Sequence, residues 1–121
     1  MHNNIHNSIL ASLSADAYLL GSHWVYDEEQ LKTLPIDWES LNPPQAMWHK
    51  GKSAGDFTHY GDQTFFLLEY MKEHQSFDKQ DFYTFWKSKM SSYKGYIDGA
   101  TRNALENMGS ANNDLSICGR I

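Results

Sequence analysis

The stretch from Gly55 to Met71 constrains the fold of this chain more than any other. It reads GDFTHYGDQTFFLLEYM, in which a polar first half with two glycines gives way to an almost uninterrupted apolar half. This change predicts a loop that leads into a buried helix over residues 62–74. We expect Asp62 to cap that helix, because its carboxylate can accept from the unpaired N–H groups of the first turn. A second interpretation stays open: a rigid helix would also hold Asp62 where a ligand or cation could meet it.

Apolar periodicity and capping residues predict helices in the rest of the chain. The expected ranges are Ser8 to Gly21, Asp27 to Leu34, Asp78 to Tyr93 and Asp98 to Gly109. Gly21 is expected to end the first helix in a left-handed conformation. No strand pattern, repeat or heptad is present, so the sequence predicts an all-α helical bundle that occupies residues 1–121 as one domain.

Two polar residues near the first helix each have two interpretations. Asp16 falls on the apolar face formed by Ile9, Leu13 and Leu20, where a charge needs a partner. It is either a structural carboxylate, bonded to backbone N–H groups or to Arg102, or a carboxylate that faces a polar cleft. His23 is either a structural histidine beside a tryptophan or a functional group that titrates near neutral pH.

Composition narrows the classes of partner. The net charge is −5 and no basic cluster is present, so the sequence offers no surface that would steer nucleic acid. No apolar run is long enough to cross a bilayer, and the N-terminus lacks the layout of a signal peptide. A single cysteine, Cys118, excludes an intrachain disulfide and predicts a cytoplasmic location.

Four motifs, in this order, resemble the N-terminal portion of the ADP-ribosylglycohydrolase family, whose fold is shared with dinitrogenase reductase-activating glycohydrolase and the J-type crystallins. They are Ala15-Asp16-Ala17 with Gly21; Gly55-Asp56-Phe57-Thr58 with Gly61-Asp62-Gln63-Thr64; Lys94-Gly95-Tyr96 with Gly99, Thr101 and Arg102; and Asn113-Asp114-Leu115-Ser116 with Gly119-Arg120. The resemblance spans nearly the whole chain. It implies an all-α domain of which this chain is the N-terminal part, apparently truncated.

The resemblance also implies an activity. Members of the family hydrolyse ADP-ribosyl bonds with two bound Mg²⁺ ions, which take oxygen ligands and activate a water. By this resemblance Asp62 is the expected catalytic residue, and Asp62, Gln63 and Thr64 are the expected metal ligands. Gly95, Tyr96 and Gly99 are expected to bind ADP-ribose or an ADP-ribosylated acceptor.

The sequence departs from the family pattern at the central motif. Gly61 and Gln63 replace a threonine and an aspartate of the family's Thr-Asp-Asp-Thr run, and the chain contains no Asp-x-Asp. The hydrolase site is therefore expected to be incomplete in this chain, which alone is expected to be inactive. The alternative function is a catalytically silent relative that binds ligands or serves a structural role. An incomplete bundle would expose an apolar face, so we also expect self-association or partial disorder.

Overall fold

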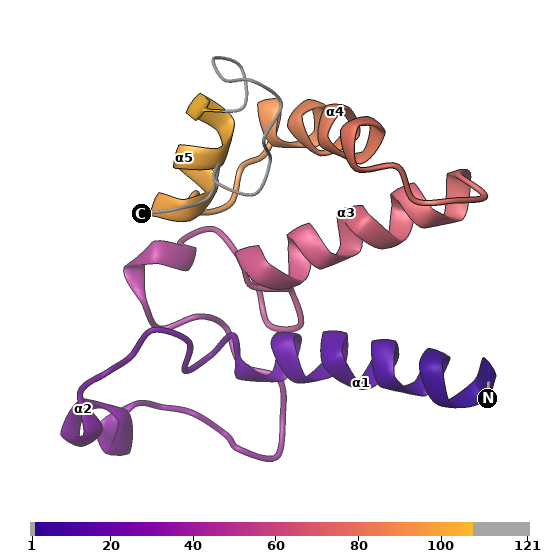
Figure 1. The fold of residues 1–121 in the computed structure, drawn as a ribbon. Coiled ribbons are helices and arrows are strands. Elements are labelled where there is room, and N and C mark those ends of the chain that lie inside the picture. The colour runs from indigo at the N-terminus through magenta and orange to yellow at the C-terminus, as the bar shows by residue number, and fades with distance from the viewer. Residues whose placement is uncertain (1, 108–121) are drawn as a thin grey trace. The chain divides into compact units, whose positions relative to one another are not determined.

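The computed structural model describes residues 2–107, which form helices joined by loops and contain no strand (Figure 1). The helices are α1 (His2–Leu19), α2 (Glu28–Thr33), a 3₁₀ helix η1 (Met47–His49), α3 (His59–Glu73), α4 (Lys79–Ser91) and α5 (Gly99–Asn107). The all-α prediction is confirmed over this range. The expected helix end at Gly109 and the motif from Asn113 to Arg120 lie outside the described residues.

Contacts divide the chain into two compact units, Met1–Phe77 and Asp78–Ile121. Each unit is described by itself below. The single domain expected over residues 1–121 stays a prediction.

Three predicted aspartate caps are confirmed. Asp27, Asp78 and Asp98 precede α2, α4 and α5, and each carboxylate accepts from a backbone N–H three residues further on. The donors are Gln30, Asp81 and Thr101, at 2.6, 2.8 and 2.6 Å. An aspartate in this position satisfies an N–H that the helix itself leaves unpaired.

The first helix is longer than predicted and ends differently. It begins at His2, because no glycine or proline interrupts the first turns, and the Ser8 hydroxyl donates to the Asn4 carbonyl (2.8 Å) instead of capping. Gly21 does not take the left-handed conformation that we expected; Trp24 does, with φ of 65°. Gly21 is needed for space, since a Cβ atom there would lie 2.6 Å from Cβ of Asn42.

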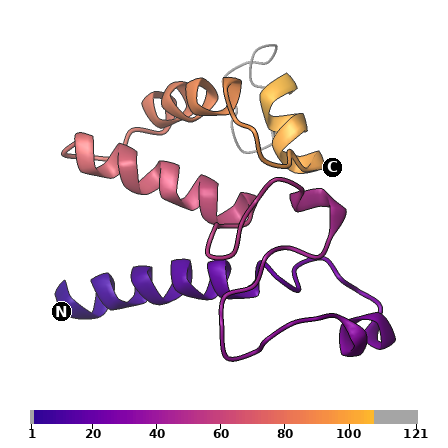
Figure 2. The ribbon, with the colours of Figure 1, turned by 180° about the vertical axis from the view of Figure 1, so that it is seen from behind.

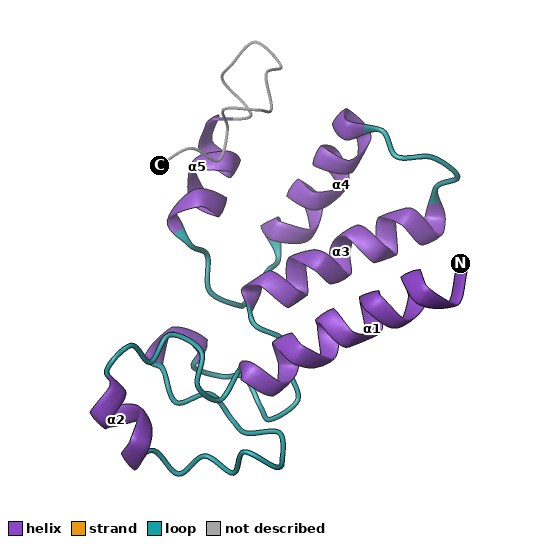
Figure 3. Ribbon diagram, turned by 60° about the horizontal axis from the view of Figure 1, so that its bottom comes forward, coloured by secondary structure: helices purple, strands orange, loops and turns teal. Residues whose placement is uncertain are grey.

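In the first unit, α1 and α3 lie side by side and antiparallel (Figure 3). Ala17 and Leu20 of α1 and Tyr70 of α3 are buried. The prediction of a buried helix is wrong for α3, because Phe65 and Met71 are each 44% exposed. Helix α3 is therefore half-buried and packs through one face.

The start of α3 also differs from the prediction. Thr58 is the N-cap, and its Oγ1 accepts from the Tyr60 N–H at 3.1 Å. Asp62 lies inside the first turn and is not the cap that we expected, because the helix begins three residues earlier, at His59. A carboxylate in the first turn is still favoured by the positive end of the helix dipole.

A long loop separates α2 from α3 and contains η1 (Figure 2). The buried Asn42 organises its first part: its amide donates to the carbonyls of Asp37 and Ser40 and its carbonyl accepts from the Asp37 N–H. The second part returns the chain to Thr58. None of the helices within residues 2–107 has the length and apolar character needed to span a membrane.

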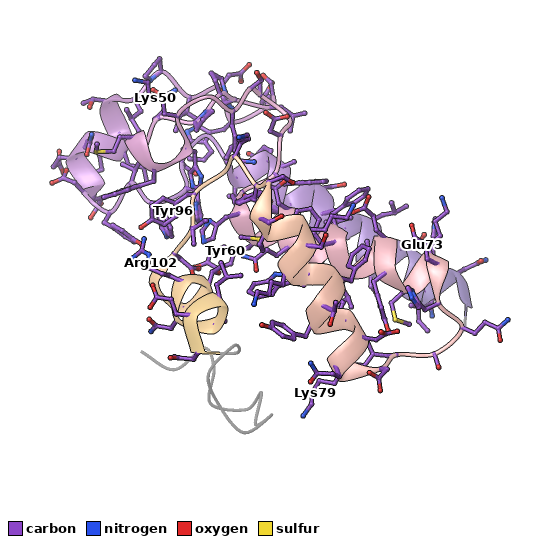
Figure 4. All side chains as sticks on the ribbon, turned by 90° about the horizontal axis from the view of Figure 1, so that it is seen from above. Lys50, Tyr60, Glu73, Lys79, Tyr96 and Arg102 are labelled. Atoms are coloured by element: carbon purple, nitrogen blue, oxygen red, sulfur yellow. The ribbon has the colours of Figure 1, made fainter. Side chains whose placement is uncertain are left out.

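The second unit contains α4 and α5. Tyr83 and Met90 of α4 and Thr101 of α5 are buried. Figure 4 labels Arg102 on α5; its guanidinium donates to the Ile97 carbonyl at 3.3 Å.

Candidate functional site

The first candidate site is the junction where α1 meets the start of α3. Asp16 accepts from the Thr58 N–H (2.8 Å) and from the Thr58 hydroxyl (2.6 Å), one bond to each carboxylate oxygen. This geometry favours the structural interpretation of Asp16. Gly61 makes the approach possible, because a Cβ atom there would lie 2.7 Å from both Cγ of Asp16 and Cβ of Phe57.

Asp62, the predicted catalytic residue and metal ligand, lies one residue beyond Gly61. Its carboxylate pairs with Nζ of Lys52 at 2.7 Å, and the two side chains are only 21% and 16% exposed. The first turn of α3 therefore carries a largely buried carboxylate whose charge is balanced by an ammonium group from the preceding loop. A cation that binds Asp62 must compete with Lys52.

The other two predicted metal ligands follow directly on α3. Gln63 is half-buried, and the exposed Thr64 donates its hydroxyl to the Tyr60 carbonyl at 2.9 Å. Successive residues of an α-helix point about 100° apart, so Asp62, Gln63 and Thr64 do not converge on one point. Within residues 2–107, no three His, Cys, Asp or Glu side chains are arranged to hold a metal ion.

A magnesium ion nevertheless suits this junction in part. Mg²⁺ usually keeps several waters and takes only one or two carboxylates from a protein. Asp62 offers one carboxylate on a rigid helix, provided that Lys52 moves aside. The Thr64 hydroxyl keeps lone pairs as an acceptor while it donates to Tyr60.

The predicted ADP-ribose-binding residues belong to the second unit, in the loop before α5 and at its first residue. Gly95 lies against the ring of Tyr93, because a Cβ atom there would be 2.8 Å from Cε1 of that ring. Gly99 begins α5 directly after the capping residue Asp98, with no atom within 4 Å of a Cβ position. Tyr96 is half-buried between the two glycines.

Sequence reasoning missed a histidine cluster in the first unit, formed by His23, His49 and His59 with Trp24 and Tyr60. The three imidazole centroids lie 4.9, 5.9 and 5.8 Å apart, and His49 and His59 are fully buried. Nδ1 of His23 and Nε2 of His49 are 2.7 Å apart and share a hydrogen bond. Figure 4 labels Tyr60 near the start of α3.

Trp24 lies against all three imidazoles of this cluster. Its ring stacks on His23 (4.9 Å) and His49 (5.3 Å) and lies 4.7 Å from His59. A left-handed φ is strained for a bulky residue and is found most often where the surroundings hold it in place. Only His23 carried a signal in the sequence, since the separations of 26 and 10 residues along the chain follow no helical or strand period.

Burial is the largest influence on the charge state of the cluster. Together with the nearby His23, His59 and Lys52, and against the weaker opposing effect of Asp16, it lowers the pKa of His49 to about 4. Burial also lowers the pKa of His23, with His59 acting in the same direction. Both imidazoles of the hydrogen-bonded pair are therefore neutral at pH 7.

Comparison with protein-family models, with curated proteins and with solved structures gave no match to this chain. Its family and activity are therefore proposals that rest on its own motifs and on the geometry described above.

Proposed function

We propose that this chain is an ADP-ribosylglycohydrolase-like protein whose site for ADP-ribosyl bond hydrolysis includes the start of α3. One observation carries the proposal: Asp16 from α1 lies against Gly61, and Asp62 follows Gly61 in the first turn of α3, at the positive end of a half-buried helix. The start of a helix stabilises carboxylate oxygens, and those oxygens can also bind a divalent cation.

Magnesium is part of the proposal. Asp62 would be its protein ligand, and Gln63 and Thr64 are the other oxygen-bearing side chains of this turn. When bound, the ion supplies a polarised water for attack on the glycosidic carbon. Asp62 is the catalytic residue in this proposal, and Asp16 holds Thr58 and hence the first turn of α3 in position.

The loop before α5 is proposed to bind the ADP-ribosyl group. Gly99 leaves the backbone accessible at the start of α5, Gly95 lies against the Tyr93 ring, and Tyr96 between them offers a ring and a hydroxyl to a nucleotide. An ADP-ribosylated acceptor is the corresponding substrate class.

The test is release of ADP-ribose. The purified chain is incubated with N-linked and O-linked ADP-ribosylated acceptors in Mg²⁺ or in EDTA, and free ADP-ribose is measured by chromatography. Hydrolysis by this chain would give release in Mg²⁺ only, and a loss of at least about a hundredfold in Asp62→Asn. Asp56→Asn is the matched control, because Asp56 is an exposed aspartate of the same motif that accepts from the Ser53 N–H. No release from any acceptor would remove hydrolysis by this chain alone and would favour the second candidate below.

A catalytically silent relative is the second candidate. Two contacts favour it: Lys52 already neutralises Asp62, and both oxygens of Asp16 are engaged by Thr58. Calorimetry would then show binding of ADP-ribose with no turnover, whether or not Mg²⁺ is present. Turnover in the assay above would exclude it.

Location and assembly complete the proposal. A single cysteine, Cys118, supports a cytoplasmic location. The exposed apolar side chains Phe65 and Met71 on α3 support self-association. Light scattering that gives a monomer at all concentrations would contradict self-association.

A further inference from the structure

We infer that His23 and His49 form an acid-sensitive latch, which holds the η1 loop (residues 46–52) against the end of α1 and opens when the pair takes up a proton. The hydrogen bond between Nδ1 of His23 and Nε2 of His49 joins segments 26 residues apart in the chain. A second tie nearby is the bond from the Gln45 N–H to the Gly21 carbonyl, at 3.2 Å. The latch therefore connects the η1 loop to the core of the first unit.

Proton counting explains why acid should open the latch. Two neutral imidazoles carry two hydrogens on four nitrogens, and exactly one must lie between the facing nitrogens of the pair. The neutral pair can place its other hydrogen on Nε2 of His23, which leaves Nδ1 of His49 bare. That nitrogen is buried, and it has no hydrogen-bond partner within residues 2–107.

When the pair takes up one proton, Nδ1 of His49 can no longer remain without a hydrogen. With three hydrogens and one between the rings, Nδ1 of His49 must carry an N–H that is buried without an acceptor. A second added proton puts hydrogens on both facing nitrogens and breaks the bond. Exposure of His49 to water satisfies its N–H groups, so protonation favours the open loop.

Most of the groups around the pair disfavour its protonation. Lys52, three residues after His49, and His59 on α3 disfavour added positive charge, while Asp16 on α1 favours it more weakly. Tyr60 meets His23 edge-on, with the ring centroids 5.8 Å apart. The Trp24 ring covers both imidazoles, so opening also separates Trp24 from His49.

Opening would also affect the candidate site. Lys52 is the last residue of the η1 loop, and its ammonium pairs with Asp62. Release of the loop would therefore weaken that pair and uncover the Asp62 carboxylate. This last consequence alone rests on the proposed function; the latch itself does not.

Amide hydrogen exchange of the full chain at pH 7 and at pH 4.5 tests the latch, after correction for the pH dependence of intrinsic exchange. A latch in which His49 titrates near 4 when closed and near 6.5 when open should lose protection of amides 46–52 by about 60-fold between pH 7 and pH 4.5. The amides of α1 and α3 should keep their protection. Protection lost equally in all three segments would be general acid unfolding and would overturn the inference.

Two variants and one direct titration sharpen the test. In His49→Gln the amide side chain can donate to neutral His23 or accept from charged His23, so the η1 loop should stay protected at pH 4.5. His6→Gln removes an exposed histidine from α1 and should open like the original chain. If His49→Gln does not fold, NMR titration of the His49 ring in the unaltered chain decides. A midpoint near 4 with loss of protection supports the latch, and a midpoint near 6.5 with protection unchanged overturns it.

Discussion

Replacing Gly61 by alanine should destabilise the first unit, although alanine is the better helix former. The new Cβ atom would lie 2.7 Å from Cγ of Asp16 and 2.7 Å from Cβ of Phe57, where ordinary contacts begin at 3.4 Å. Overpacking of this kind costs about 1–3 kcal/mol. Displacing Asp16 would also weaken its two bonds to Thr58, and a hydrogen bond to a charged group contributes about 1.5–3 kcal/mol.

The gain in helix propensity offsets only part of this cost. Alanine is favoured over glycine inside a helix by about 1 kcal/mol. We therefore expect the free energy of unfolding to fall by about 1–3 kcal/mol in Gly61→Ala, measured by urea denaturation with circular dichroism at 222 nm and an unchanged m-value. Gly99→Ala is the matched control, since no atom lies within 4 Å of its Cβ position, and it should change stability by less than about 0.5 kcal/mol.

A double-mutant cycle isolates the contact with Asp16. In an Asp16→Ala background, Gly61→Ala should cost at least about 1 kcal/mol less than in the original chain, because the carboxylate that it meets is gone. A Gly61→Ala chain as stable as the original would refute the reasoning. It would mean that Asp16 does not lie against the start of α3 as described.

Three further predictions concern charge and capping. The free energy of unfolding should be highest above pH 6.5 and should fall by up to about 3 kcal/mol as the pH is lowered to 4, because the folded state holds the pKa of His49 at about 4. A free energy of unfolding that does not change over this range would contradict the prediction. Asp98→Ala should destabilise α5 by about 1 kcal/mol through loss of its cap, seen as faster exchange of α5 amides, whereas the exposed Glu106→Ala should leave exchange nearly unchanged. Lys52→Met should raise the affinity for Mg²⁺ about tenfold, because it removes the charge that competes for Asp62. An unchanged affinity by calorimetry would show that Lys52 and Mg²⁺ do not compete.

Local signals in the sequence predicted most of the helices. The caps at Asp27, Asp78 and Asp98 depend on residues three positions apart, so the pattern contains both partners. The start of α3 was misplaced because Thr58 competes with Asp62 for the role of cap. That competition is decided by Asp16, which lies 42 residues earlier in the chain and engages the Thr58 side chain and N–H.

In the candidate site, too, local patterns predict some features and long-range contacts determine the others. Asp62 and its helix could be identified from the polar-to-apolar change, but its partner Lys52 lies in a loop whose path no local pattern specifies. The histidine cluster was also out of reach, because it joins three segments and depends on a left-handed Trp24. Long-range contacts of this kind are set by tertiary packing and not by periodicity.

Manganese titration of the ¹⁵N-labelled chain tests the proposed metal site most directly, since Mn²⁺ prefers the same oxygen ligands as Mg²⁺ and broadens nearby NMR signals. We predict selective, saturable broadening of the amides of residues 61–64 that excess Mg²⁺ reverses and that Asp62→Asn abolishes. Broadening confined to exposed acidic residues such as Glu28 and Glu29, with the start of α3 unaffected, would contradict the proposal.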